Sequence, residues 1–163
     1  MRYIFLEKLI KENNLKIGAE IGVWYGETFL YLLKNCPGLI LYGVDIWVDK
    51  SFSPHHSDQK QNRMDVLEKA KSYWERALII EKPSVEAAKD FQDGYLDFVF
   101  IDAEHSFEAV NADIEAWSPK VRAGGFITGH DYSHGWPGVK KAVDLHFAHV
   151  KVEMSDFVWW VQK

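Results

Sequence analysis

The sequence predicts an α/β fold built on a mostly parallel sheet. Short apolar runs alternate with segments of helical periodicity along most of the 163 residues. Such alternation is typical of strand–helix–strand units joined by right-handed crossovers. The runs are apolar nearly throughout rather than at every second position, as expected for strands covered on both faces. Two further runs lie close together at the C-terminal end, so we expect seven strands that include a C-terminal antiparallel hairpin.

Five apolar runs are expected to form the parallel strands. They are Ala19–Val23, Leu39–Asp45, Ala77–Glu81, Leu96–Ile101 and Gly125–Gly129. The last two runs, Val150–Met154 and Phe157–Val161, are separated only by Ser155 and Asp156. Because a parallel crossover needs a much longer connection, these two runs predict the antiparallel hairpin.

Five segments carry apolar residues at helical spacing. They are the first segment up to Asn13-Asn14, Thr28–Cys36, Gln59–Arg76, Phe107–Trp117 and Val139–Phe147. Pro37-Gly38 follows the second segment and Pro119 follows the fourth, and both are typical of helix ends. The sequence contains no internal repeat, low-complexity tract or linker. Residues 1–163 are therefore expected to form a single domain.

The composition excludes several classes of protein. Hydrophobic residues make up 47% and charged residues 26%, the balance of an ordinary globular domain. The net charge of −5 and the lack of a concentrated basic stretch give no basis for nucleic-acid binding. No apolar stretch approaches the roughly 20 residues that span a bilayer, so no membrane partner is expected. The charged N-terminal segment is unlike a signal peptide and predicts a cytoplasmic protein, and the single cysteine cannot form an intrachain disulfide.

A glycine-containing turn follows the first strand. Gly22 and Gly26 allow the backbone to turn tightly and to approach a ligand at the start of the next helix. In open α/β sheets, ligands bind at the carboxyl ends of the strands where the strand order reverses. The spacing is not the G-x-G-x-x-G of dinucleotide sites, and Glu20 would repel a pyrophosphate but suits an amine or a sulfonium. A nicotinamide-dependent dehydrogenase is therefore a less favoured alternative.

Asp45 ends the second strand and is a candidate ligand for a nucleoside. A carboxylate at this place can accept hydrogen bonds from both hydroxyls of a ribose. As an alternative, Asp45 could simply cap the strand end. Trp47, two residues further on, could pack on an adenine or fill the core.

Two carboxylates and two histidines follow the fourth and fifth strands. Asp102 and Asp131 end these strands, and His105 and His130 accompany them. Carboxylate oxygens with imidazole suit a divalent cation such as Mg²⁺ or Mn²⁺, which could lower the pKa of a substrate hydroxyl. As alternatives, Asp102 could bind an amino group of the cofactor, and His105 could cap the following helix or hydrogen-bond Asp102.

These motifs resemble the class I S-adenosylmethionine-dependent methyltransferases, and within them the small-molecule O-methyltransferase branch grouped as methyltransferase family 24. The resemblance spans roughly Lys16 to Phe147. It rests on E-I-G-V-W-Y-G-E-T (20–28), L-Y-G-V-D-I-W (41–47), L-D-F-V-F-I-D-A-E-H-S-F-E-A-V-N-A-D-I-E-A-W (96–117) and G-G-F-I-T-G-H-D-Y (124–132). It implies a Rossmann-like three-layer αβα sandwich that binds S-adenosylmethionine.

The resemblance also implies roles for individual residues. Asp45 would hold the ribose, and the turn that contains Ser84 would border the adenine. The full set of implied cofactor-binding residues is Glu20, Gly22, Val23, Trp24, Gly26, Thr28, Asp45, Ile46, Trp47, Ser84 and Asp102. Metal-dependent O-methyltransferases would hold their cation at the positions of Asp102, His130 and Asp131, and would have their base at His105. His130 departs from the family pattern, because a carboxylate usually stands there.

The sequence therefore predicts an enzyme that transfers a methyl group from S-adenosylmethionine to a small-molecule acceptor at oxygen. His105 and Asp102 are the predicted catalytic residues, with Mg²⁺ or Mn²⁺ as a candidate second cofactor. The alternative is an inactive methyltransferase-like fold that binds the cofactor or its product as a binding module. Residues 49–62 and Tyr132–Gly138 are the expected acceptor walls, and a homodimer could complete the pocket.

Overall fold

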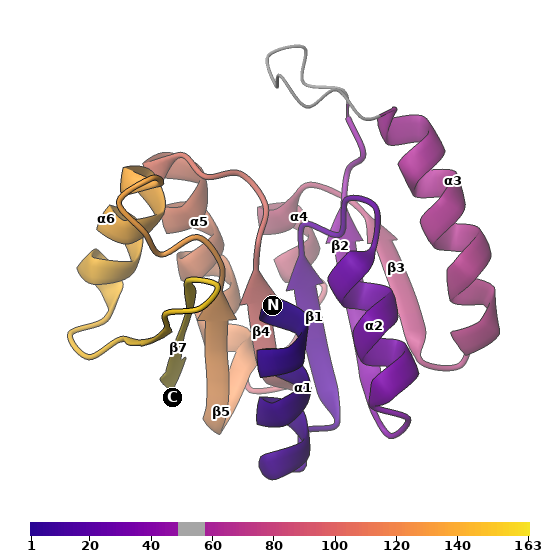
Figure 1. Cartoon of the computed structure of the whole chain (residues 1–163), viewed down its shortest axis with the longest axis horizontal. Coiled ribbons are helices and arrows are strands. Elements are labelled where there is room, and N and C mark those ends of the chain that lie inside the picture. Colours follow the sequence, from indigo (N-terminus) through magenta and orange to yellow (C-terminus); the bar gives the residue numbers. More distant parts are fainter. Residues whose placement is uncertain (49–57) are drawn as a thin grey trace.

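A computed structural model describes residues 1–48 and 58–163, and these form a seven-stranded sheet with helices on both faces (Figure 1). The strand order is β3-β2-β1-β4-β5-β7-β6, with β7 antiparallel to both of its neighbours and the other strands parallel. The strands are β1 (Ile17–Ile21), β2 (Ile40–Asp45), β3 (Ala77–Glu81), β4 (Leu96–Ile101), β5 (Val121–Gly129), β6 (Lys151–Glu153) and β7 (Val158–Gln162). This arrangement confirms the predicted Rossmann-like sandwich with a C-terminal hairpin.

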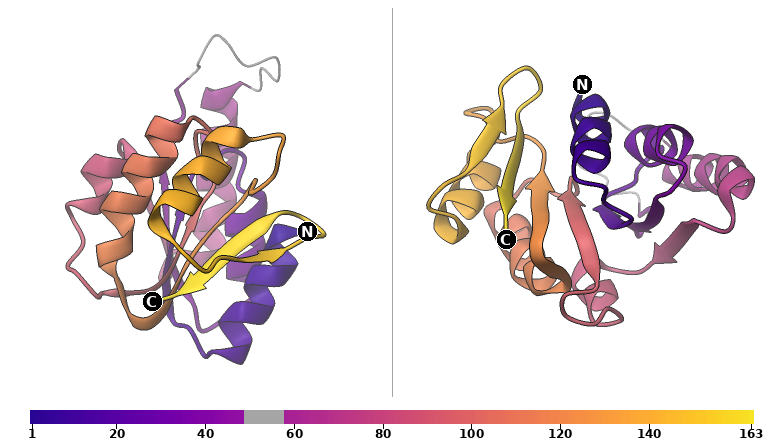
Figure 2. Two further views of the ribbon diagram at one scale, coloured as in Figure 1. Left: turned by 90° about the vertical axis from the view of Figure 1, so that its left-hand side faces the viewer. Right: turned by 90° about the horizontal axis from the view of Figure 1, so that it is seen from below.

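The helices form two layers, one on each face of the sheet (Figure 2). One apolar core contains buried residues of α1, α2 and α3, such as Leu6, Phe29 and Val66. The other core contains residues of α4, α5 and α6, such as Val110 and Val143. The helices are α1 (Arg2–Glu12), α2 (Glu27–Asn35), α3 (Gln59–Ala70), α4 (Ser84–Ala88), α5 (Phe107–Trp117) and α6 (Pro137–His146).

The strand order reverses at β1 and β4. Strand β1 pairs with β2 on one side and with β4 on the other, so the winding of the chain reverses between them. Outside such a reversal, at the carboxyl ends of the strands, open α/β sheets bind their ligands. The N–H of Asp102 donates to the carbonyl of Ile21 (2.8 Å), which holds the two strand ends together.

The third predicted helix is shorter than expected. It ends at Ala70 and continues only as a 3₁₀ turn to Tyr73, and Trp74 is 73% exposed. The Arg76 guanidinium donates to the carbonyls of Leu33 (2.5 Å), Cys36 (3.2 Å) and Leu39 (3.2 Å). These bonds satisfy carbonyls near the end of α2 and direct the chain into β3. A long-range contact of this kind leaves no signal in helical periodicity.

Other boundaries also differ from the sequence expectation. The short helix α4 was not expected, and it buries Ala87 and Ala88 against the sheet. Strand β5 begins at Val121 rather than at Gly125, because an irregular register between β4 and β5 carries the strand past the glycines. The hairpin turn spans residues 154–157 rather than two residues. Within the described ranges, no helix has the length and apolar composition needed to cross a bilayer.

Candidate active site

The turn after β1 is held in shape by Asp45. Its Oδ2 accepts hydrogen bonds from the N–H groups of Val23 (2.8 Å) and Trp24 (2.7 Å), and its Oδ1 accepts one from Trp47 (2.8 Å). The Trp47 indole donates to the carbonyl of Trp24 (2.7 Å) and is nearly buried. A carboxylate has about four lone-pair sites, so Asp45 can hold the turn and still accept from a ligand.

Two glycines of this turn have backbone angles that favour glycine. Gly22 has φ +91°, and a Cβ there would lie 2.2 Å from the carbonyl oxygen of Asp102. Gly26 has φ +81° and is the N-cap of α2. The absence of a side chain at Gly22 lets the end of β1 lie directly against the end of β4, and a Cβ at Gly26 would lie 2.8 Å from the side chain of Val66.

Glu20 is a buried carboxylate on β1 with an unsatisfied oxygen. It is 3% exposed, and among the described residues its Oε2 has no hydrogen-bond partner. Burial, and then the charge of Asp102, raise the pKa of Glu20 well above its ordinary value. An unpaired acceptor in this position fits a positively charged ligand group.

We expect Glu20→Gln to raise the melting temperature of the cofactor-free protein at neutral pH. Because the pKa of Glu20 is raised in the folded state, its carboxyl group does not destabilise the fold below pH 4.5, the ordinary value, where it is protonated in both the folded and the unfolded state. Folding stability is then lost as the pH rises through the folded pKa. Thermal unfolding between pH 4.5 and 8 should show a variant advantage that grows with pH, whereas exposed Glu86→Gln should show none. An advantage that is independent of pH would contradict this assignment.

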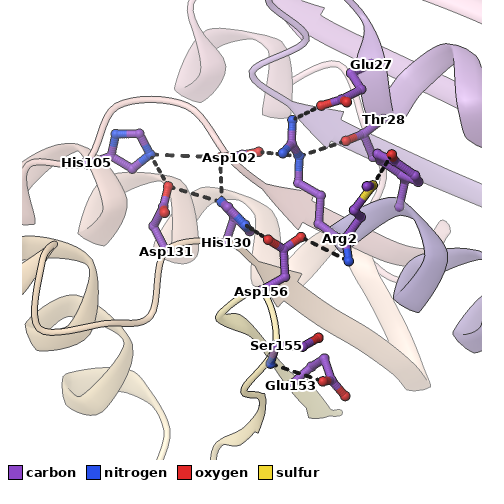
Figure 3. Close-up of polar contacts among 12 residues, drawn as sticks. Arg2, Glu27, Thr28, Asp102, His105, His130, Asp131, Glu153, Ser155 and Asp156 are labelled. Atoms are coloured by element: carbon purple, nitrogen blue, oxygen red, sulfur yellow. Dashed lines mark hydrogen bonds and ion pairs between the residues drawn. The ribbon is translucent and has the colours of Figure 1, made fainter.

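Asp102, His105 and Asp131 form a compact group at the ends of β4 and β5 (Figure 3). One ligand atom from each residue lies within 4.8 Å of the others. His105 Nε2 lies 2.8 Å from Asp131 Oδ2 and 3.9 Å from Asp102 Oδ1. Despite the short contact, His105 Nε2 has no aligned hydrogen bond within the described part of the chain. Asp131 has φ +61°, a conformation that aspartate and asparagine tolerate better than most residues.

His130 approaches the same carboxylates from the other side. Its Nδ1 lies 3.1 Å from Asp131 Oδ2 and 3.7 Å from Asp102 Oδ1, and its Nε2 lies 3.8 Å from Asp156. The carboxylates of Asp102 and then Asp131 raise the pKa of His105 to about 9. Burial opposes the charge on His130, but Asp131 and Asp102 raise its pKa. Burial would raise the pKa of Asp131, but its close contacts with both histidines lower it.

Several contacts of this site were not expected from the sequence. Arg2, from the start of α1, donates to Thr28 Oγ1 (2.9 Å) and pairs with Asp102 (3.3 Å). The ring of Trp136 packs on His105 with centroids 4.4 Å apart. Asp156, in the hairpin turn, faces His130. Arg2 and Asp156 lie in no motif and reach the site from distant parts of the chain, whereas Trp136 belongs to the predicted acceptor wall Tyr132–Gly138.

The remaining predicted cofactor residues are Ile46, Trp24, Thr28 and Ser84, and the Ser84 side chain points in a direction that was not expected. Ile46 and Trp24 are exposed beside the turn after β1, and Thr28 is buried. The hydroxyl of Ser84 accepts from the Trp117 indole (2.9 Å) and is hydrogen-bonded to Asp113, so it faces α5 rather than a ligand. Of the predicted acceptor walls, residues 49–57 lie outside the described residues.

The fold and the glycine turn define an S-adenosylmethionine-dependent methyltransferase of the Rossmann-like class. The family model described as a methyltransferase domain, methyltransferase family 24, matches residues 19–132. The chain belongs to this methyltransferase family. The match favours the methyltransferase interpretation over the dehydrogenase alternative and confirms the resemblance found in the motifs.

Solved structures share the fold over nearly the whole chain. A Staphylococcus aureus protein assigned as a caffeoyl-CoA O-methyltransferase has a TM-score of 0.72 at 16% identity, with 99% of this chain and 83% of that chain covered. The S-adenosylhomocysteine-bound methyltransferase PaMTH1 of Podospora anserina has a TM-score of 0.71 at 17% identity, with 99% and 77% covered. The O-methyltransferase of Bacillus cereus in complex with S-adenosylhomocysteine has a TM-score of 0.66 at 18% identity, with 99% and 80% covered.

A curated relative is the uncharacterized protein y4gI of Sinorhizobium fredii. It is 24% identical over 117 residues, which are 69% of this chain. The chain spans only 13% of the length of that relative, so this match indicates a shared domain and says nothing of the rest of the larger protein.

Proposed function

We propose that this chain transfers a methyl group from S-adenosylmethionine to a hydroxyl of a small molecule. The observation that carries the proposal is the group of Asp102, His105 and Asp131, which lies at the same sheet edge as the glycine turn. A cofactor on the turn and an acceptor at this group would be held side by side. Most of the rate enhancement would then come from proximity and orientation.

The residues at the turn would bind the cofactor through complementary chemistry. The unpaired carboxylate of Glu20 would face the positively charged methionine part, and Asp45 would accept from the ribose hydroxyls. Trp24, 39% exposed beside the turn, offers an aromatic face at the rim of the site. Ser84 would contribute through its backbone, since its hydroxyl is already bonded to Trp117.

Asp102, His105 and Asp131 would hold a divalent cation, which when bound supplies Lewis acidity to the acceptor hydroxyl. His105 Nε2 and Asp131 Oδ2 lie 2.8 Å apart without an aligned hydrogen bond, and an imidazole nitrogen and carboxylate oxygens are donor types that divalent cations accept. Without a cation, His105 would take the acceptor proton in its neutral form, and because its pKa is raised to about 9, turnover by this route should increase as the pH rises toward that value.

The acceptor would lie against Trp136, which packs on His105 and is 45% exposed. This residue belongs to the segment Tyr132–Gly138, which forms part of the proposed acceptor wall. Its flat, partly exposed ring suits a small organic molecule better than a polymer. We also propose that a second copy of the chain completes the pocket. Residues 1–163 would form a single domain.

A coupled assay of S-adenosylhomocysteine formation tests the proposal. The protein is incubated with S-adenosylmethionine and a panel of phenols, catechols and sugar hydroxyls, with Mg²⁺, with Mn²⁺ and with EDTA. We expect turnover with at least one acceptor, and its loss in EDTA with recovery by Mg²⁺ or Mn²⁺. Turnover that is indifferent to EDTA would favour His105 as the base, and cofactor binding without any turnover would favour the binding-module alternative.

A further inference from the structure

The N-terminal helix brings a cation into the edge of the cofactor site. Leu6, Leu9 and Ile10 bury one face of α1 in the same core as α2. This packing fixes the start of the helix beside the carboxyl ends of β1 and β4, where Figure 3 shows Arg2 pointing toward Asp102.

The Arg2 guanidinium has several partners and still has free donors. Its Nη2 pairs with Glu27 Oε2 (3.0 Å), and its Nε donates to Thr28 Oγ1 (2.9 Å) and faces Asp102 Oδ2 (3.3 Å). Among the described residues, no hydrogen bond of Nη1 is found. A guanidinium carries five N–H donors in a planar fork, a shape that matches a carboxylate. The side chain is 21% exposed, so the free donors are partly shielded from water.

The charges around Arg2 suit one part of the methionine moiety in particular. Asp102, Glu27 and Glu20 act electrostatically on Arg2, and Asp45 acts on Glu20; all four are acidic. The ammonium and sulfonium of the cofactor would be attracted to these groups, but its α-carboxylate would be repelled. Arg2 lies among these acidic groups and pairs with Asp102 and Glu27. Its positive charge would attract the α-carboxylate of the cofactor.

We propose that Arg2 binds the α-carboxylate of the methionine part of S-adenosylmethionine. In the free protein Arg2 neutralises Asp102. In the complex the ammonium of the cofactor takes this place on Asp102, and the guanidinium, still held by Glu27, turns its free donors to the carboxylate. The inference rests on the proposed function, and it makes α1 part of the cofactor site.

Calorimetric titration with S-adenosylmethionine and with decarboxylated S-adenosylmethionine, which lacks only the carboxylate, tests the inference. We expect Arg2→Ala to weaken S-adenosylmethionine binding by about 10- to 100-fold, the value of a charge-assisted pair. Binding of the decarboxylated compound should change by less than about threefold. Arg2→Lys should retain part of the affinity, because it keeps the charge without the planar fork.

Lys8→Ala is the matched control, since Lys8 lies on the same helix, is 71% exposed and pairs only with Glu12 in the described structure. It should bind both compounds as the unmodified chain does, and thermal unfolding should show that each variant is folded. If Arg2→Ala lost affinity equally for both compounds, Arg2 would have a structural role. If the variant bound both compounds more tightly, Arg2 would obstruct the site. Either result overturns the inference. If the unmodified chain binds neither compound, the proposed function fails instead.

Discussion

Replacing Asp131 by asparagine is expected to lower the rate constant of methyl transfer by about 100- to 1,000-fold, with less than a threefold change in the affinity for S-adenosylhomocysteine. One oxygen of Asp131 contacts both His105 (2.8 Å) and His130 (3.1 Å), so its charge holds the group together. Asparagine keeps the shape and tolerates φ +61°, so the backbone is not strained. Initial rates with a saturating acceptor give the rate constant, and calorimetric titration with S-adenosylhomocysteine gives the affinity.

Asp93→Asn is the control for this substitution. Asp93 precedes β4, is 72% exposed and pairs with Lys120 at the opposite edge of the sheet from the site. The same loss of one negative charge should leave both transfer and binding unchanged there. A full rate in Asp131→Asn would show that the acceptor is activated elsewhere. A parallel loss of product affinity would instead place Asp131 in the cofactor site.

Replacing Asp45 by alanine is expected to weaken S-adenosylmethionine binding by about 100-fold or more. Asp45 accepts three backbone hydrogen bonds that shape the glycine turn, from Val23, Trp24 and Trp47. Loss of the charge-assisted hydrogen bonds that Asp45 would make to the ribose, with a combined value of about 3 kcal/mol, corresponds to about 100-fold. A turn that is no longer held in its binding shape adds to this loss. Calorimetric titration of the variant with the cofactor gives the affinity directly.

Asp45 would both shape the turn and bind the ribose. Titration with a 2′-deoxy analogue of the cofactor separates these two effects. The unmodified chain should bind the analogue more weakly than the natural cofactor, and Asp45→Ala should no longer distinguish them. Asp65→Ala, on α3 with a side chain bonded to Gln61, provides a control outside the turn. If Asp45→Ala continued to prefer the natural ribose, another group would have to recognise the hydroxyls.

The sequence could predict those parts of the site that depend on neighbours along the chain. Gly22 and Gly26 stand at fixed positions in a strand-to-helix turn, and Asp45 ends a strand, so their patterns are local. The parallel strands and the hairpin were likewise predictable, because apolar runs and short links are read from a few residues. The strand ends that carry Asp102 and Asp131 followed from the same pattern.

The parts that could not be predicted depend on contacts between distant segments. Arg2 reaches Asp102 across 100 positions, and Asp156 reaches His130 from the hairpin turn. The resemblance implied a metal site of Asp102, His130 and Asp131 with His105 as the base, whereas the compact group contains His105 in place of His130. The direction of each imidazole is decided by packing, in which Trp136 covers His105.

The buried carboxylate of Glu20 would link the stability of the fold to binding of the proposed cofactor. An unpaired acceptor in a core destabilises the folded chain, and a fold selected for stability alone would not retain it. Its neighbours Asp102 and Asp45 add to the unfavourable negative charge, and Arg2 only partly offsets it. A cationic ligand would relieve this repulsion, so cofactor binding should stabilise the protein against thermal unfolding.

Calorimetric titration of the unmodified chain with S-adenosylmethionine and with S-adenosylhomocysteine tests the central claim most directly. We expect one site per chain for each compound, with a dissociation constant in the micromolar range, and loss of binding in Asp45→Ala. No heat of binding for either compound, with the protein shown to be folded by its thermal unfolding transition, would contradict the account and leave a methyltransferase fold without its cofactor.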